Sequence, residues 1–89
     1  MEKNILVLDT NSFWSQFLKI LYPLSNIMWA NSLTQAEPIL YQHPIDCLIC
    51  PAQCIPLFIS LLLDVRQISP GTSVILIGQD VMQLSSNKI

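Results

Sequence analysis

Four short apolar runs, each followed by a segment with helical spacing, constrain the fold of this chain more than any other feature. The runs are residues 4–8, 27–30, 45–50 and 73–77. Apolar runs of this length, rich in branched side chains, are typical of strands that are buried on both faces. Strands that alternate with helices form right-handed β-α-β units around a parallel sheet. We therefore expect an α/β fold with an open parallel sheet of four strands and alternating helices.

The segments between these runs carry the spacing and the boundary residues of helices. Helices are predicted at residues 11–22, 32–42 and 55–68, with a short further helix at 80–84. Thr10 or Asn11 would cap the first of them. In the second, Thr34 and Glu37 have the spacing of a capping box, whereas Pro38 is tolerated only in a first turn. The start of the second helix therefore stays open.

The composition of the chain indicates that part of its surface is covered by another protein. The chain has 89 residues, which fits a single domain spanning residues 1–89. It is 52% hydrophobic and only 11% charged, whereas a soluble domain carries roughly 25% charged residues. With so few charges, we expect some apolar surface to be buried against a protein partner or a second copy.

Charge and hydropathy patterning disfavour several classes of function. The net charge is −2 and the four basic residues are scattered, so there is no basic face for a nucleic acid. The apolar stretches fall short of the about 20 residues that span a bilayer, and the first is too short for a signal peptide. Three cysteines without a secretory signal favour reduced thiols. We therefore expect a cytoplasmic protein that binds no nucleic acid and has no membrane span.

The three cysteines, spaced C-x2-C-x3-C, raise the alternative of a small metal or redox module. Two thiolates three residues apart can share a metal in a turn or at a helix start. Cys47 and Cys50 instead fall within a predicted strand, where residues i and i+3 point to opposite faces. We therefore interpret them as core residues and expect neither a metal site nor a cofactor. Cys54 lies near the start of the third predicted helix, where the helix dipole can lower the pKa of a thiol.

The carboxyl ends of the predicted strands are the expected place for any binding site. In open parallel sheets, ligands bind in the crevice beyond these ends, at the point where the strand order reverses. The corresponding segments are residues 9–11, 51–53 and 78–80. Functional side chains should therefore come from these three segments.

The order and the ends of the strands resemble the receiver domain of bacterial two-component response regulators. NILVLDTN resembles the first receiver strand, which ends in an acidic pair, and WANSLTQAEPIL resembles the second strand and helix. PIDCLICP resembles the third strand, which ends in the phosphorylated aspartate, and SPGTSVILIG resembles the fourth, which ends in Ser or Thr. The resemblance covers about four of the five β-α units of the family and implies a receiver-like, flavodoxin-like sheet.

At the positions that carry the chemistry of the family, this sequence differs. The resemblance implies a Mg²⁺ site made by two first-strand acids and the acceptor aspartate, because Mg²⁺ prefers several oxygen ligands. Asp9 matches one acid, but Thr10 takes the next position and Gly78 the position of the hydroxyl. The acceptor position falls on Pro51, or on Cys50 if the register slips by one, and neither can form an acyl phosphate. These residues predict a degenerate phosphorylation pocket, in which Asp9 is either a remaining metal ligand or a cap of the first helix or turn.

The third predicted helix is apolar around most of its circumference, which is more than one sheet face requires. A helix that covers a sheet needs an apolar arc of a little over 100°. With the receiver strand order 2-1-3-4-5 and no fifth strand, residues 73–77 become an uncharged edge, which is a template for pairing with another chain. The expected interface residues are Leu57, Phe58, Leu61, Leu62, Val65, Val74 and Leu76.

These features predict a shortened, degenerate receiver-like domain that is not an enzyme. We expect a phosphorylation-independent protein-protein interaction module that associates with itself. The resemblance implies a regulatory or scaffolding role in bacterial signalling. A metal or redox module that uses Cys47, Cys50 and Cys54 stays open as the alternative. An enzyme on a flavodoxin-like sheet would need phosphate-binding loops, yet Gly71 and Gly78 are the only glycines.

Overall fold

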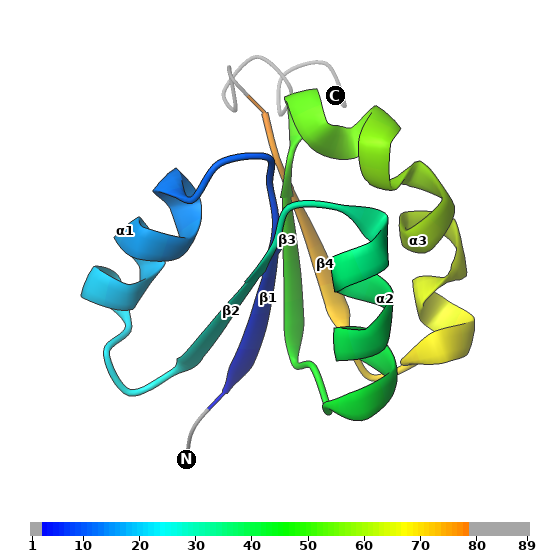
Figure 1. The fold of residues 1–89 in the computed structure, drawn as a ribbon. Helices are drawn as coiled ribbons and strands as arrows, with labels where there is room; N and C mark the ends of the chain where they lie inside the picture. Colours follow the sequence, from blue (N-terminus) through cyan, green and yellow to red (C-terminus); the bar gives the residue numbers. More distant parts are fainter. Residues whose placement is uncertain (1–2, 79–89) are drawn as a thin grey trace, which may run out of the picture.

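The computed structural model describes residues 3–78, which form one parallel sheet between two helical layers (Figure 1). The strands are β1 (Asn4–Leu8), β2 (Asn26–Ala30), β3 (Cys47–Pro51) and β4 (Ser73–Ile77). Their order in the sheet is β2-β1-β3-β4, and every neighbouring pair is parallel. The α/β sheet of four parallel strands that the sequence predicts is confirmed, within the described residues.

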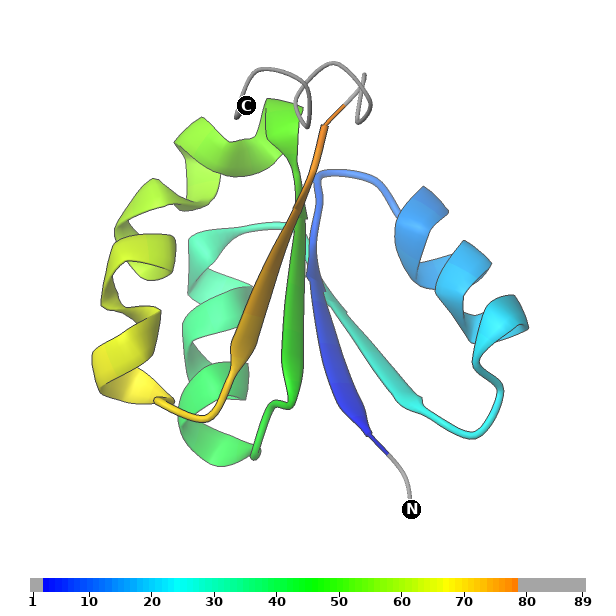
Figure 2. The ribbon, with the colours of Figure 1, turned by 180° about the vertical axis from the view of Figure 1, so that it is seen from behind.

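The helices cover the two faces of the sheet unequally. They are α1 (Phe13–Leu21), α2 (Leu33–Gln42) and α3 (Ile55–Ile68), and the short 3₁₀ turn η1 (Ala52–Cys54) precedes α3. α1 lies on one face of the sheet, and α2 and α3 lie together on the other (Figures 1 and 2). The bounds predicted for the third helix and the fourth strand are confirmed, whereas the short helix predicted at residues 80–84 lies outside the described residues.

The first helix begins two residues later than expected, because side chains of the preceding loop hold its backbone. Asp9 Oδ1 accepts a hydrogen bond from the backbone N–H of Asn11 at 3.3 Å. Asn11 Oδ1 in turn accepts one from the N–H of Phe13 at 2.9 Å. Two consecutive turns of this kind compete with helix formation. Ser12 is therefore the N-cap residue, in place of Thr10 or Asn11.

The second helix is capped by a different residue from the one that the sequence indicated. Ser32 is the N-cap, and its hydroxyl accepts the N–H of Gln35 at 3.4 Å. The capping box predicted for Thr34 and Glu37 is therefore wrong, because the N-cap lies two residues before Thr34. Pro38 lies beyond the first turn of α2, where a proline removes one intrahelical donor. The helix contains it at an exposed position.

The third strand is shifted toward the carboxyl end relative to the prediction. It begins at Cys47 instead of Ile45 and includes Pro51. Asp46 belongs to the preceding loop, where its Oδ2 accepts the N–H of Asn4 at 2.8 Å. Pro51 has no N–H for the ladder, and it is accommodated as the last residue of the strand, opposite Ile77.

The core is divided by the sheet into a large cluster and a small one. The large cluster lies under α2 and α3 and includes Leu6, Leu48 and Phe58. The small cluster lies under α1; its buried residues are Val7, Leu18, Ile27 and Ile49. The face that carries a single helix is therefore packed less extensively than the face that carries two.

Candidate functional site

The carboxyl ends of β1, β3 and β4 meet at one edge of the sheet, as expected for a site in this fold. β3 pairs with β1 up to Val7 and Ile49, and with β4 up to Pro51 and Ile77. Asp9 follows β1 and Gly78 follows β4, so these residues and Pro51 lie at the same edge. The structure thus brings the strand ends of the predicted pocket together.

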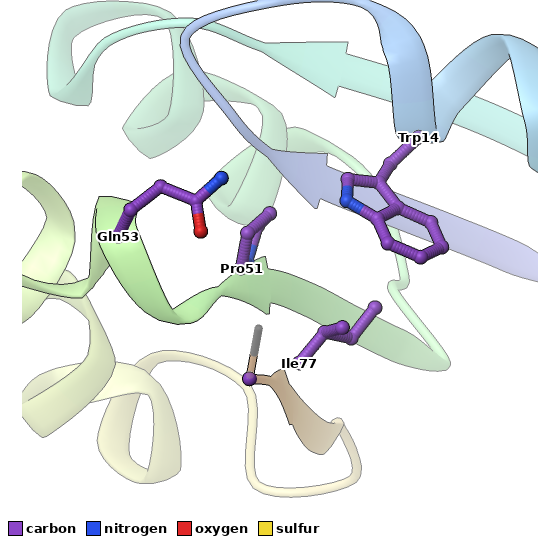
Figure 3. A pocket seen from close by; sticks show the side chains of 5 residues that line it. Trp14, Pro51, Gln53 and Ile77 are labelled. Atoms are coloured by element: carbon purple, nitrogen blue, oxygen red, sulfur yellow. The ribbon is translucent and has the colours of Figure 1, made fainter. Parts of the chain in front are cut away.

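A hollow of about 480 Å³ opens at this edge. Its lining residues are Trp14, Pro51, Gln53, Ile77 and Gly78. Figure 3 shows these side chains around the hollow, with Trp14 coming from α1 and with Pro51 and Gln53 coming from the end of β3 and the turn after it. Among residues 3–78, this lining carries no charged side chain. The amide of Gln53 and the backbone are its polar groups, so the described residues of the lining offer no carboxylate that could accept a phosphoryl group.

The Asp9 carboxylate is not part of that lining, because its side chain is turned into the protein. Asp9 is only 1% exposed. Its Oδ1 accepts hydrogen bonds from the Asn11 N–H and from the Cys54 thiol, both at 3.3 Å. Its Oδ2 is buried and has no hydrogen-bond partner within the described part of the chain. The predicted role of Asp9 as a cap of the turn is confirmed, and the Cys54 thiol is a second partner that the sequence did not indicate.

The residues around Asp9 do not fit the Mg²⁺ site that the receiver resemblance implies. Mg²⁺ requires a nearly octahedral set of oxygen ligands. The partners of the Asp9 side chain are a backbone N–H and a thiol, both of which donate hydrogen bonds. Across residues 3–78, no group of three His, Cys, Asp or Glu side chains is placed to hold a metal ion. The buried Oδ2 atom is a single acceptor, and no second carboxylate of residues 3–78 joins it in a metal-binding group.

The three cysteines are divided between the two faces of the sheet, as the strand spacing predicts. Cys50 and Cys54 belong to the large core cluster, whereas Cys47 packs against the small one under α1. All three are free thiols. Cys47 and Cys50 therefore cannot share one metal or one disulfide within this fold, which removes the three-cysteine site of the alternative hypothesis.

The thiols are held in their protonated form by burial. Burial, assisted by Cys54 and Asp9, raises the pKa of Cys50 from 9.0 to about 12. Burial likewise raises the pKa of Cys54. The Asp9 carboxylate raises this pKa further, whereas hydrogen bonds with Thr10 lower it. The prediction that the start of α3 lowers the thiol pKa of Cys54 is therefore wrong in direction. The reason is that the thiol lies in the core and donates a hydrogen bond to a carboxylate instead of facing solvent.

The outer side of α3 is apolar and exposed, but three of the residues predicted for the interface lie on its inner side. Phe58, Leu61 and Val65 are buried against the sheet. The interface prediction is wrong for Phe58 and Leu61, because their side chains form the core, whereas Val65 is 2% exposed and also lines a groove beside β4. Leu57 is exposed and Leu62 is half-buried. The residues of α3 that present the largest apolar surface are Leu57, Ile59 and Leu63.

An apolar groove of about 670 Å³ runs between α3 and β4. We call it the α3–β4 groove; its lining residues are Ile55, Ile59, Leu62, Leu63, Val65, Arg66, Thr72, Ser73, Val74 and Leu76. Val74, Ile75 and Leu76 of β4 are all exposed. β4 pairs with β3 on one side, and no strand within residues 3–78 pairs with its other side. The structure thus places the two predicted β4 interface residues at an open edge, beside the exposed side of α3.

A second exposed apolar surface, on α1, was missed by the sequence reasoning. The residues Phe13, Phe17, Ile20 and Leu21 are exposed, although apolar residues at helical spacing are expected to face the protein interior. Phe13 and Phe17 stack on each other, and both meet the ring of half-buried Trp14 edge to face. The helix inserts mainly Ser15 and Leu18 into the protein. Because α1 contacts the sheet through so few residues, its other apolar side chains stay exposed to solvent.

Comparison with known proteins identifies the fold but no close relative. A response regulator from Thermotoga maritima matches this structure with a TM-score of 0.71 and 18% sequence identity, over 99% of this chain and 78% of that chain. No family model and no curated protein matches the sequence. The chain therefore has a receiver-like α/β fold. Within the described residues, no helix is long and apolar enough to cross a membrane.

Proposed function

We propose that this chain is a protein-protein interaction module that associates with itself and works without phosphorylation. The observation that carries the proposal is the continuous apolar surface made by the outer side of α3 and the open edge of β4. Leu63 is 74% exposed, and it lines the same groove as Val74 and Leu76. Exposed apolar patches on a domain with few charges mark interaction surfaces.

Phosphorylation independence is supported by the chemistry at the carboxyl edge of the sheet. The residue that ends β3 is Pro51, which has no group that can accept a phosphoryl group. The nearby carboxylate, Asp9, is buried and accepts hydrogen bonds from a backbone N–H and a thiol. A phosphoryl donor would need an exposed nucleophile, and among the described residues the hollow at this edge is lined by Trp14, Gln53 and Ile77 instead.

The biological setting that we propose is a regulatory or scaffolding role in bacterial signalling. It is supported by the similarity of the fold to a response regulator, a similarity that concerns architecture and not chemistry. The three free thiols, two of them buried, fit a reducing compartment such as the cytoplasm. The module would act by occupying a partner surface and not by transferring a group.

A phosphodonor experiment tests the two halves of this proposal together. The protein is incubated with Mg²⁺ and a small acyl phosphate, and its mass is measured by mass spectrometry and by light scattering over a range of concentrations. We expect no phosphoryl adduct and a solution mass that rises with concentration equally with and without the donor. A response regulator with an intact acceptor aspartate serves as the positive control.

Two outcomes would contradict the proposal in different ways. A phosphoryl adduct on this chain would refute phosphorylation independence. A monomer at all concentrations, with and without the donor, would refute self-association.

A further inference from the structure

The open edge of β4 has the properties of a strand that pairs with another strand. Its sequence, SVILI, contains no charge and no proline, which are the usual protections of an edge. Ile75 is 48% exposed, and Val74 and Leu76 on either side of it are exposed as well. Backbone N–H and C=O groups along such an edge are satisfied best by a second extended strand.

We propose that β4 pairs antiparallel with β4 of a second copy, with Ile75 opposite Ile75 on the two-fold axis; this proposal rests on the self-association proposed above. When the pair is centred on Ile75, all five residues of β4 lie opposite a residue of the second β4. Val74 then faces Leu76 of the second copy, and Ser73 faces Ile77. The two four-stranded sheets join into one sheet that continues through both copies.

The symmetry follows from the geometry of the edge. Two copies of one edge come together antiparallel through a two-fold axis perpendicular to the sheet. This operation places α3 of both copies on the same face. Val74 and Leu76 point to that face, because they pair with Leu48 and Cys50 of the large core cluster. The two α3–β4 grooves then form one groove, with Leu63 of each copy on its walls.

On the opposite face of β4, the central residue Ile75 is also free for such pairing. Ile75 pairs with Ile49, a member of the small core cluster, and so it points to the α1 side of the sheet. α1 packs mainly over β2 (Figure 2), and its Trp14 approaches β4 at Ile77, where the two side chains line the same hollow. Two Ile75 side chains can therefore meet on the axis without contacting a helix of the described residues.

The size of this contact predicts a reversible dimer. A five-residue strand is about 17 Å long, and a sheet with one helix layer is about 20 Å deep. A contact of these dimensions covers about 340 Å² on each copy and about 700 Å² in total, which is below the roughly 1,200 Å² of stable interfaces and in the range of weak, transient ones. A contact of this size predicts weak association that depends on concentration, and a second copy needs no complementary charge, since β4 has none.

A pair of opposite charge substitutions at the axis tests the register. Ile75→Lys and Ile75→Glu each place like charges opposite each other in the homodimer, and we expect each to weaken dimerisation at least about tenfold. An equimolar mixture of the two should recover dimers of mixed composition, which native mass spectrometry distinguishes by mass. The control pair is Ile20→Lys and Ile20→Glu on α1, where the native side chain is 77% exposed. These variants should dimerise like the wild type, alone and mixed.

The possible outcomes separate this proposal from the broader one. If the wild type associates and the Ile75 variants associate equally well, the β4 pairing is refuted while self-association stands. Loss of association in the Ile20 variants alone would assign the interface to α1 and refute the pairing as well. A wild type that is monomeric at every concentration refutes both proposals. Circular dichroism of each variant establishes that the fold is retained.

Discussion

Asp9 and Cys54 form a buried carboxylate–thiol contact at the position where a receiver-like fold would carry its chemistry. The contact joins the end of β1 to the start of α3 across the core. It leaves Oδ2 of Asp9 without a partner among the described residues. A buried carboxylate in such surroundings is costly unless other groups satisfy it. The Asp9 side chain therefore stabilises the turn after β1 through its bond to the Asn11 N–H, and its carboxylate is shielded from solvent.

Burial of Cys50 makes the stability of this protein depend on alkaline pH. The folded-state pKa of about 12 lies above the ordinary value of 9.0, so the folded protein keeps a proton that the unfolded chain releases in this interval. The stabilisation is fully present below about pH 9 and is lost as the pH rises toward 12. We expect the free energy of unfolding to fall by about 1 kcal/mol per pH unit through this thiol. Urea unfolding at several alkaline pH values measures it.

The Cys50→Ala variant is the matched control for this pH dependence. It removes the thiol, so its stability should fall less steeply over the same interval. The other ionisable groups are the same in both proteins, and their contribution cancels in the difference between the two curves. Parallel curves for the wild type and the variant would contradict the assignment to Cys50.

α3 combines a core side and an exposed side within one apolar helix. Leu61 is 2% exposed and Leu63 is 74% exposed, although only one residue separates them. The sequence pattern identified the excess of apolar residues but did not assign each one to a side. The interface residues predicted from the sequence therefore came from both the buried and the exposed side of α3.

Lysine substitutions at these two leucines should have opposite effects. Leu63→Lys adds a charge to the α3–β4 groove, and we expect it to weaken self-association about tenfold while changing the free energy of unfolding by less than about 0.5 kcal/mol. Leu61→Lys buries an unpaired charge and should destabilise the fold by more than about 4 kcal/mol. Urea unfolding and sedimentation measure the two quantities. Equal destabilisation by both variants would show that Leu63 is a core residue and would contradict the interface.

The elements themselves were predictable because each depends on local patterns. Apolar runs gave the strands, and the bounds of the third helix and the fourth strand were predicted correctly. The start of α1 was predicted two residues too early. The side chains of Asp9 and Asn11 accept hydrogen bonds from the backbone two residues further on, and these bonds compete with the helix in a way that hydrophobic periodicity does not reveal. The contact between Asp9 and Cys54 joins residues that are 45 positions apart. A contact of this kind requires the folded arrangement, and no spacing in the sequence indicates it.

The whole molecule has an uneven distribution of helices over its sheet. In the order β2-β1-β3-β4, the step from β1 to β2 runs in one direction and the later steps run in the other. Right-handed crossovers then place α1 on one face and both α2 and α3 on the opposite face. Given the strand order, this rule predicts that α1 lies on the opposite face from α2 and α3. It also leaves the β3–β4 half of the α1 face without a helix among the described residues (Figure 2).

The central claim is that the protein associates with itself through the apolar region formed by β4 and α3. Amide hydrogen exchange of the wild type, followed by mass spectrometry at micromolar and millimolar concentrations, tests it most directly. We predict that exchange in residues 73–77 slows as the concentration rises, because the free edge of β4 becomes paired, while exchange in α1 stays the same. Exchange in β4 that does not depend on concentration would contradict the claim.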